Sequence, residues 1–249
     1  MSSHAGPKLM YRNILSLSRS HQITLASFID SNEKNMASIL EDSGIEVHTV
    51  NYPRNQKSMS GKLASGIHNI SPMISYLKGD EPFFFAKYNK KEMKNLISRL
   101  ITNNAFDLVQ VEYNVMHHYS ALFENTPSVI VFHDVSTKVH ERGQSEGNTY
   151  NKRSYQIAKK IEADIANKFD GVVTLTQEDQ LYLKKLGCIK EIHVIPPQVK
   201  ILEKIDVQKV PNTICFVGSF NREPNVHAVE LLRSDERRVG KECRSRWSP

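Results

Sequence analysis

The sequence predicts an α/β fold built on a doubly wound parallel sheet. Apolar runs of strand length alternate with amphipathic helical segments along most of the chain. The run at residues 128–132 is rich in β-branched residues, as is typical of a parallel strand buried on both faces. Polar residues directly follow several of these runs, and open α/β sheets bind ligands at that edge.

The predicted strands are short apolar runs that stand between turn residues. In the first of them, Ile23 and Leu25 recur at the period of two that a strand requires. The predicted strands cover residues 21–28, 45–50, 107–112, 128–132, 171–175, 191–195 and 212–217.

The predicted helices show apolar residues at helical spacing and turn residues at their ends. Pro7 suits a helix entry, and Gly44 and Gly187 suit helix ends. Pro72 predicts an interruption of the third helix. The predicted helices cover residues 8–20, 32–43, 59–77, 89–103, 115–123, 150–168, 177–186 and 224–232.

Composition limits the class of protein. The 249 residues are 39% hydrophobic and 24% charged, which is typical of a folded soluble protein. No apolar run reaches the roughly 18–20 residues of a membrane span, and the N-terminus lacks the apolar region of a secretory signal. The three cysteines have no metal-binding spacing and cannot all pair with one another. We therefore expect a cytoplasmic protein.

The segment 196–211 predicts a linker, because it contains three prolines and few strongly apolar residues. We expect a first domain over residues 1–195. A strand, a turn and a helix over residues 212–232 predict the start of a second domain.

The last 17 residues, 233–249, have a composition of their own. They hold six of the 33 basic residues and three of the 27 acidic ones, which is half of the formal net charge of +6. A basic tail for nucleic acid is one interpretation. However, the string RSDERRVGKECRSRWSP resembles the in-frame translation of a sequencing adapter. We therefore expect a non-native tail and no nucleic-acid partner.

Polar residues at two strand ends are the strongest site candidates. His133 and Asp134 follow strand 128–132, and Glu112 ends strand 107–112. A histidine at a strand end can shuttle a proton or hydrogen-bond a sugar hydroxyl. The alternatives are that His133 caps a neighbouring segment and that Asp134 is a helix N-cap.

Glycines with nearby cations form weaker candidates. Gly218 and Arg222 lie between strand 212–217 and the following helix, where backbone amides favour a phosphate. The alternative is an ordinary turn with Arg222 facing solvent. Gly6 and Lys8 lie in a small-residue segment before the first helix, and its alternative is a frayed terminus.

The sequence predicts no metal site. His117 and His118 are adjacent on a short helix, where neighbouring side chains diverge by about 100°. On that argument they cannot bind one ion from one face.

Taken in order, seven segments resemble family-4-type glycosyltransferases of the GT-B fold. They are the Gly-Pro-Lys segment with its helix, HQITLASF, DLVQVEYNVMHHY, VIVFHDVSTK, FDGVVTLTQEDQLYLKKLG, IHVIPPQV and ICFVGSFNREPNVHAVELL. The resemblance covers residues 5–232 and implies a Rossmann-like first domain, mainly for the acceptor. It also implies a second Rossmann-like domain for the nucleotide.

The resemblance implies a hexosyltransferase-type enzyme that moves a sugar from a nucleotide-sugar donor to an acceptor. Retention of configuration, no cofactor and no essential metal are expected. The acceptor would be a glycan, a lipid-linked compound or a small molecule, with peripheral membrane contact.

The resemblance also implies residue roles. His133 would lie near the transferred sugar, with Glu112 and Asp134 on the acceptor side. Gly6 with Lys8, and Gly218 with Arg222, would approach the donor phosphates.

Three departures limit this resemblance. No strand precedes the Gly6 segment, and Gln198 replaces the glycine of the family's linker motif. Most of the donor domain would lie beyond Leu232. We therefore expect an inactive fragment that lacks its first strand. The alternative is a non-enzymatic Rossmann-like module that binds a nucleotide or a protein.

Overall fold

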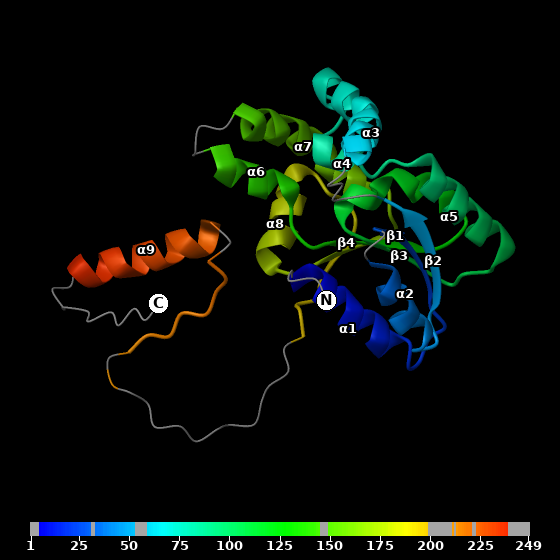
Figure 1. Ribbon diagram of the computed structural model, residues 1–249, viewed down its shortest axis with the longest axis horizontal. Coiled ribbons are helices and arrows are strands. Elements are labelled where there is room, and N and C mark those ends of the chain that lie inside the picture. The colour runs from blue at the N-terminus through cyan, green and yellow to red at the C-terminus, as the bar shows by residue number, and fades with distance from the viewer. Residues whose placement is uncertain are drawn as a thin grey trace. The chain divides into compact units, whose positions relative to one another are not determined.

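The computed structural model divides the chain into two compact units, Met1–Val199 and Lys200–Pro249. It describes residues 5–30, 33–52, 59–144, 149–198, 211, 213–220 and 223–238. The first unit has the α/β composition that the sequence predicts, with helices around parallel strands (Figure 1).

All strand pairs in the first unit are parallel. One sheet contains β1 (Thr24–Ile29) and β2 (Glu46–Asn51). The other has the order β3-β4-β5-β6, with β3 at Val109–Glu112, β4 at Ser128–Phe132, β5 at Gly171–Thr174 and β6 at Ile192–Val194. Each strand overlaps a predicted one, and β1 and β2 run one residue beyond their predicted ends, which confirms the α/β fold with parallel strands.

The strands form two sheets instead of one. Among the described residues, β1 pairs only with β2, and β3 pairs only with β4. The division falls between β1 and β3, which is where the 3-2-1-4-5-6 order of a doubly wound fold places its first strand.

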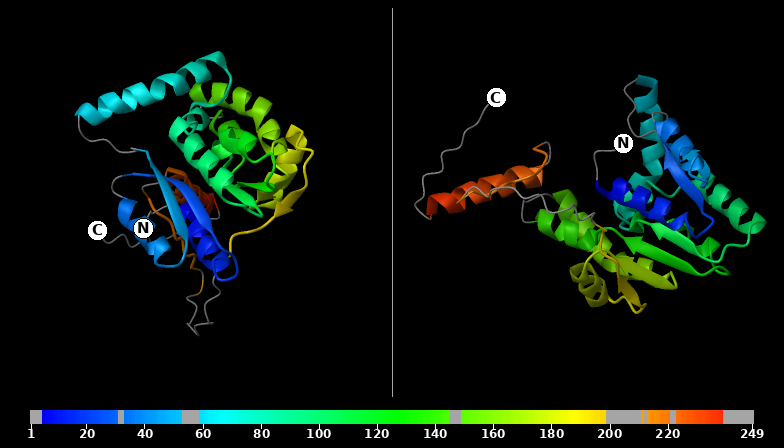
Figure 2. Two further views of the ribbon diagram at one scale, coloured as in Figure 1. Left: turned by 90° about the vertical axis from the view of Figure 1, so that its right-hand side faces the viewer. Right: turned by 90° about the horizontal axis from the view of Figure 1, so that it is seen from below.

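Nine helical segments belong to the described part of the first unit. They are α1 (Ala5–Leu17), α2 (Lys34–Glu41), α3 (Met59–Lys78), α4 (Phe83–Ala86), α5 (Lys91–Asn103), the 3-10 helix η2 (Asn114–Leu122), α6 (Ser136–Gln144), α7 (Thr149–Asn167) and α8 (Gln177–Leu186). Helices α4 and α6 were not predicted. In both views of Figure 2, the dark blue α1 lies near β3 and β4.

Helix α3 corrects one prediction, because it continues through Pro72 without a break. Proline removes only one donor from the helix ladder, so intact turns on both sides can hold the helix together. No helix in the described ranges has the combination of length and hydrophobicity that crossing a membrane requires.

The core of the first unit forms around β4, whose Ile130 and Phe132 are fully buried. Helix α5 supplies Met93 and α8 supplies Leu183, both also fully buried in the same cluster. This packing fixes the carboxyl ends of β3 and β4, where the predicted site residues lie.

The second unit corrects the predicted strand at 212–217. Residues 213–217 form no strand pairing, and the side chains of Ile214 and Val217 are exposed. A strand is held by ladder hydrogen bonds, and no described strand of this unit pairs with the segment. Helix α9 spans Glu223–Arg238, so it includes the predicted helix 224–232 and continues beyond it.

Candidate active site

The carboxyl ends of β3 and β4 bring Glu112 and His133 together. The strands are parallel neighbours, with Glu112 paired to Val131 in the register, so the residue that follows β4 reaches back toward β3. His133 Nε2 lies 2.7 Å from Glu112 Oε2. Both side chains are largely buried, with 6% of His133 and 18% of Glu112 exposed.

An aromatic ring also stacks on the face of the His133 imidazole. It belongs to Tyr113, with ring centroids 3.9 Å apart and an angle of 19° between the planes. With Glu112 accepting a hydrogen bond from the Nε2–H, this tautomer of the ring carries its lone pair on Nδ1. The site therefore presents Nδ1 as a hydrogen-bond acceptor.

Tyr113 has an unusual backbone and a perturbed hydroxyl. Its φ of 71° is the only positive value at a non-glycine residue in the described ranges. Such conformations are strained and collect at functional sites. Burial raises the pKa of the Tyr113 hydroxyl, and the charges of Glu112 and Asp134 raise it further. Tyr113 was not among the predicted site residues, although it directly follows Glu112.

Gly6 approaches this cluster from α1, where the prediction placed a loop. It lies in the first turn of the helix, and a Cβ there would collide with the Tyr113 hydroxyl. The same Cβ position lies 3.9 Å from His133 Nδ1. The glycine is therefore required by close packing, and it lines the side of the ring that carries the free lone pair.

The other predicted residues of the first unit are more peripheral. Lys8 is exposed on α1, and Asp134 is exposed after β4. The structure thus brings together Gly6, Glu112 and His133.

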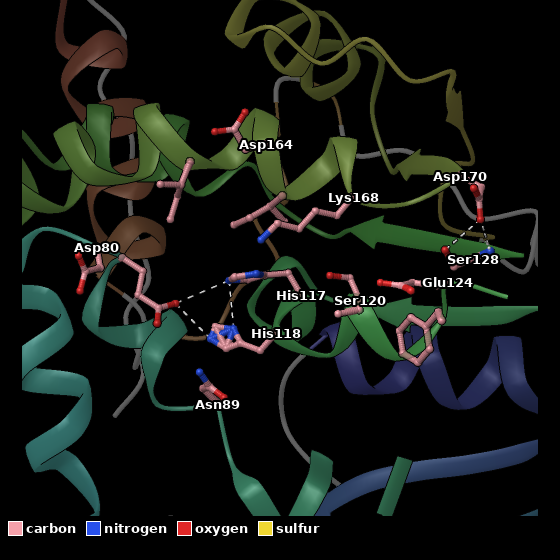
Figure 3. A pocket seen from close by; sticks show the side chains of 15 residues that line it. Asp80, Asn89, His117, His118, Ser120, Glu124, Ser128, Asp164, Lys168 and Asp170 are labelled. Carbon is pink, nitrogen blue, oxygen red and sulfur yellow. Dashed lines mark hydrogen bonds and ion pairs between the residues drawn. The ribbon is translucent and has the colours of Figure 1, made fainter. Parts of the chain in front are cut away.

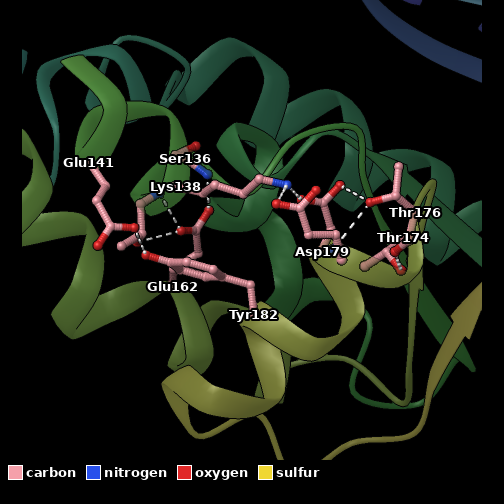
Figure 4. Close-up of polar contacts among 10 residues, drawn as sticks. Ser136, Lys138, Glu141, Glu162, Thr174, Thr176, Asp179 and Tyr182 are labelled. Carbon is pink, nitrogen blue, oxygen red and sulfur yellow. Dashed lines mark hydrogen bonds and ion pairs between the residues drawn. The ribbon is translucent and has the colours of Figure 1, made fainter.

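The buried carboxylate of Glu162 holds the segments that carry the candidate site. Glu162 on α7 is fully buried and accepts four hydrogen bonds of 2.7–2.8 Å (Figure 4). The donors are Asn114 Nδ2, the Ser136 amide, the Thr137 amide and Thr137 Oγ1. Glu162 thereby ties the residue after Tyr113 to the first turn of α6.

Burial raises the pKa of Glu162, and the hydrogen bonds from Thr137, Ser136 and Asn114 oppose that rise. The sequence prediction missed this residue. The sequence feature that could have identified Glu162 is its position on the core-facing stripe of α7, together with Ala158 and Ile165.

A second polar network joins α6 to α8. Lys138 Nζ lies 2.8 Å from Asp179 Oδ1 and 3.0 Å from Glu178 Oε1 (Figure 4). Burial acts to lower the pKa of Lys138, but the two carboxylates outweigh it and raise the pKa overall. Thr176 caps α8 by accepting a hydrogen bond from the Asp179 amide. The loops after β4 and β5 are therefore fixed to each other.

In the second unit, Gly218 lies in a tightly packed turn. A Cβ there would lie 2.8 Å from the Phe216 ring and 3.2 Å from the Asn225 side chain. Asn225 Nδ2 donates a hydrogen bond of 2.9 Å to the Ser219 carbonyl oxygen. Arg222 lies outside the described residues.

A family model described as Glycosyltransferase Family 4 matches residues 34–201, which include Glu112, His133 and Glu162. No curated protein sequence matches the chain.

One similar solved structure is Arabidopsis thaliana UGT89C1 complexed with UDP-L-rhamnose, at 12% identity and a TM-score of 0.44. The match covers 83% of this chain and 51% of that one, so the chain spans about half the length of the matched structure.

Proposed function

Because the chain belongs to Glycosyltransferase Family 4, we propose that it contributes the acceptor side of an enzyme that transfers a sugar from a nucleotide-sugar donor. The observation that supports this proposal most is the His133–Glu112 pair, held at 2.7 Å at the carboxyl edge of a parallel sheet. Ligands of open α/β sheets bind at this edge.

In this proposal, His133 is the residue that touches the sugar. Its Nδ1 accepts a hydrogen bond from a hydroxyl of the transferred sugar, since Nε2 is engaged by Glu112. The stacked Tyr113 ring prevents the imidazole from turning away. Positioning of this kind lowers the barrier by fixing the reacting groups before the transition state.

Glu112 then acts as a positioning residue and does not itself contact the acceptor. This role differs from the expected one, because its Oε2 is used by His133 and its Oε1 accepts a hydrogen bond of 2.7 Å from Gln110. Asp134, which is exposed after β4, is the carboxylate that we assign to contact with the acceptor. The acceptor would be a glycan, a lipid-linked compound or a small molecule.

We propose that Gly6 with Lys8, and Gly218 with Arg222, are the residues that contact the donor phosphates. Gly6 lies in the first turn of α1, and the backbone amides of a helix N-terminus favour a phosphate. We propose a retaining, hexosyltransferase-type reaction on the basis of the family resemblance.

The test joins residues 1–232 to a complete donor-binding domain of the family and follows release of nucleotide from nucleotide sugars. His133→Ala should lower kcat by about 100-fold or more, since positioned acid–base or hydrogen-bonding groups contribute on that scale. His48→Ala serves as the control, because His48 lies on β2 with a partly exposed side chain. Equal rates for the His133 and His48 variants would overturn the assignment of His133.

A further inference from the structure

A second cluster of chemistry-bearing side chains lies away from the His133 site. Glu81, in the turn between α3 and α4, faces His117 and His118 of η2. Glu81 Oε2 lies 3.6 Å from His117 Nε2 and 3.1 Å from His118 Nε2. His118 Nδ1 lies 3.1 Å from His117 Nε2 (Figure 3).

This geometry corrects the premise that adjacent histidines cannot face one ion. The backbone directions of His117 and His118 do diverge, but rotation of the side chains brings their rings within 4.0 Å of each other at an angle of 78°. The two imidazoles and the carboxylate each offer one ligand atom, and all three atoms lie within 4.8 Å of one another.

The cluster is buried but incompletely satisfied. The exposed side-chain fractions are 4% for His118, 11% for His117 and 15% for Glu81. Glu81 Oε2 and His118 Nε2 are buried atoms without a hydrogen-bond partner, although they lie 3.1 Å apart. Buried polar atoms are nearly always paired, so this orphaned set requires a ligand or a function to explain it.

The contact between Glu81 Oε2 and His118 Nε2 leaves both buried atoms without a hydrogen bond. When His118 carries its proton on Nδ1, its Nε2 directs a lone pair toward the Glu81 carboxylate. Two acceptors then face each other, and a cation between them would satisfy both.

The electrostatic environment also favours a cation. The cluster lines a pocket of about 790 Å³. The charged residues that line it are the acids Asp80, Glu81, Glu124, Asp164 and Asp170 and the single base Lys168. Figure 3 shows Lys168 on the α7 side of the two imidazole rings, so its ammonium is the one described charge of this lining that opposes an ion.

We propose that Glu81, His117 and His118 form a binding site for a zinc-type divalent transition metal ion. Two imidazoles and a carboxylate are a ligand set that Zn²⁺ accepts, and metal–ligand bonds of about 2.0–2.1 Å in a tetrahedron place the ligand atoms about 3.3 Å apart. The separations from Glu81 Oε2, 3.1 Å to His118 Nε2 and 3.6 Å to His117 Nε2, agree with that spacing. A fourth position, open to the pocket, is left for water.

The bound ion would connect the turn before α4 to η2, the segment that begins directly after Tyr113. Because η2 also carries Asn114, which binds Glu162, the ion would stabilise the same loop that carries the His133 site. The role is structural in the first instance, and it does not depend on the proposed transferase activity.

The test is calorimetric titration of the chelator-treated 249-residue chain with Zn²⁺ alone. One equivalent should bind, with a rise in Tm that grows with Zn²⁺ concentration, because a ligand of the folded state stabilises it by mass action. Co²⁺ in the same site should give the intense visible bands of tetrahedral coordination. Mg²⁺ should bind far more weakly, since it prefers oxygen ligands.

Variants locate the site. Glu81→Gln and His118→Asn should each weaken Zn²⁺ binding by more than about 100-fold, since loss of even an outer-shell partner costs about 10–100-fold. His48→Asn is the matched control, because His48 and Glu46 form an exposed histidine–glutamate pair at 2.8 Å. The metal-free Glu81→Gln protein should melt no lower than the metal-free parent, since the amide can donate to an unsatisfied imidazole nitrogen.

Three results would overturn the proposal. The first is Zn²⁺ affinity unchanged in a Glu81→Gln/His118→Asn double variant. The second is affinity lost only on Cys215→Ser, because Cys215 is an exposed thiol. The third is equal affinity for Mg²⁺ and Zn²⁺, which would indicate nonspecific attraction to the acidic pocket.

Discussion

The carboxylate of Glu112 accepts a hydrogen bond from His133 at 2.7 Å across two neighbouring parallel strands. The two residues are 21 positions apart in the sequence, and the register of β3 and β4 places them side by side. The first consequence of this hydrogen bond concerns the tautomer of the histidine ring.

Replacing Glu112 by alanine should remove the preference of the His133 ring for one tautomer. Without the acceptor on Nε2, the ring loses the preference for Nε2–H, and a mixture of tautomers should appear. Long-range ¹H–¹⁵N NMR spectra of the imidazole nitrogens measure this directly. Gln110→Ala is the control, since it removes a neighbour of Glu112 but leaves the acceptor in place. An unchanged ring spectrum in Glu112→Ala would contradict the assigned hydrogen bond.

Replacing Gly6 by alanine should change the stability of the protein through a contact with Tyr113. In an ordinary helix, glycine to alanine stabilises by about 0.5–1 kcal/mol. Here the added Cβ collides with the Tyr113 hydroxyl, so Gly6→Ala should destabilise by about 1–3 kcal/mol.

A double-mutant cycle separates these effects. In a Tyr113→Phe background the hydroxyl is gone, and the cost of Gly6→Ala should shrink or change sign. Urea unfolding of the four proteins gives the coupling energy. Additive free energies of unfolding would show that α1 does not pack on Tyr113 as the structure describes.

Removal of the Glu162 carboxylate should destabilise the first unit strongly. Glu162→Ala leaves donors of Asn114, Ser136 and Thr137 buried without an acceptor, at about 1–3 kcal/mol for each unsatisfied group. We expect a loss of at least about 3 kcal/mol in the free energy of unfolding, measured in urea. Asp164→Ala, an exposed acid two residues away on α7, should cost less than about 0.5 kcal/mol.

Asp170 should contribute to the acid sensitivity of the fold. Hydrogen bonds from the Ser128 amide and hydroxyl to Asp170 Oδ2, at 2.8 and 3.1 Å, lower the pKa of this exposed carboxyl below its usual 3.8. A lowered folded-state pKa means that the unfolded chain binds the proton first as pH falls. The stabilisation is therefore present at neutral pH and is lost below about pH 4.

The measurement is the urea midpoint of the parent and of Asp170→Asn at neutral pH and at about pH 3. The variant should be less stable at neutral pH and should lose less stability on acidification. Parallel pH profiles of the two proteins would rule out this contribution. Asp164→Asn is a suitable control, because it removes an exposed acid from the same pocket lining.

The parts of the fold that the sequence predicts are those decided by local pattern. The β-branched run of β4 and the glycines that end α2 and α8 act within a few residues of themselves. The placement of His133 at a sheet edge follows from the same pattern, because the residue after a parallel strand has little freedom in where it lies.

The missed features depend on contacts between distant residues. Helix α6 is polar in sequence, and its first turn is fixed by Glu162, which lies about 25 residues later in the chain. The His117–His118 cluster depends on side-chain rotation toward Glu81, which backbone periodicity does not encode. The wrong strand at 213–217 is apolar enough for a strand but has no described partner strand.

The four hydrogen bonds to Glu162 also determine when this part of the chain can fold during protein synthesis. Asn114, Ser136 and Thr137 leave the ribosome well before Glu162 does, so their donors remain solvated while α7 is still being made. The loop that carries His133 therefore acquires its final form only once the second half of α7 has emerged. A nascent chain that is stalled before residue 162 would already contain every residue of the His133 cluster, but without the support that orders it.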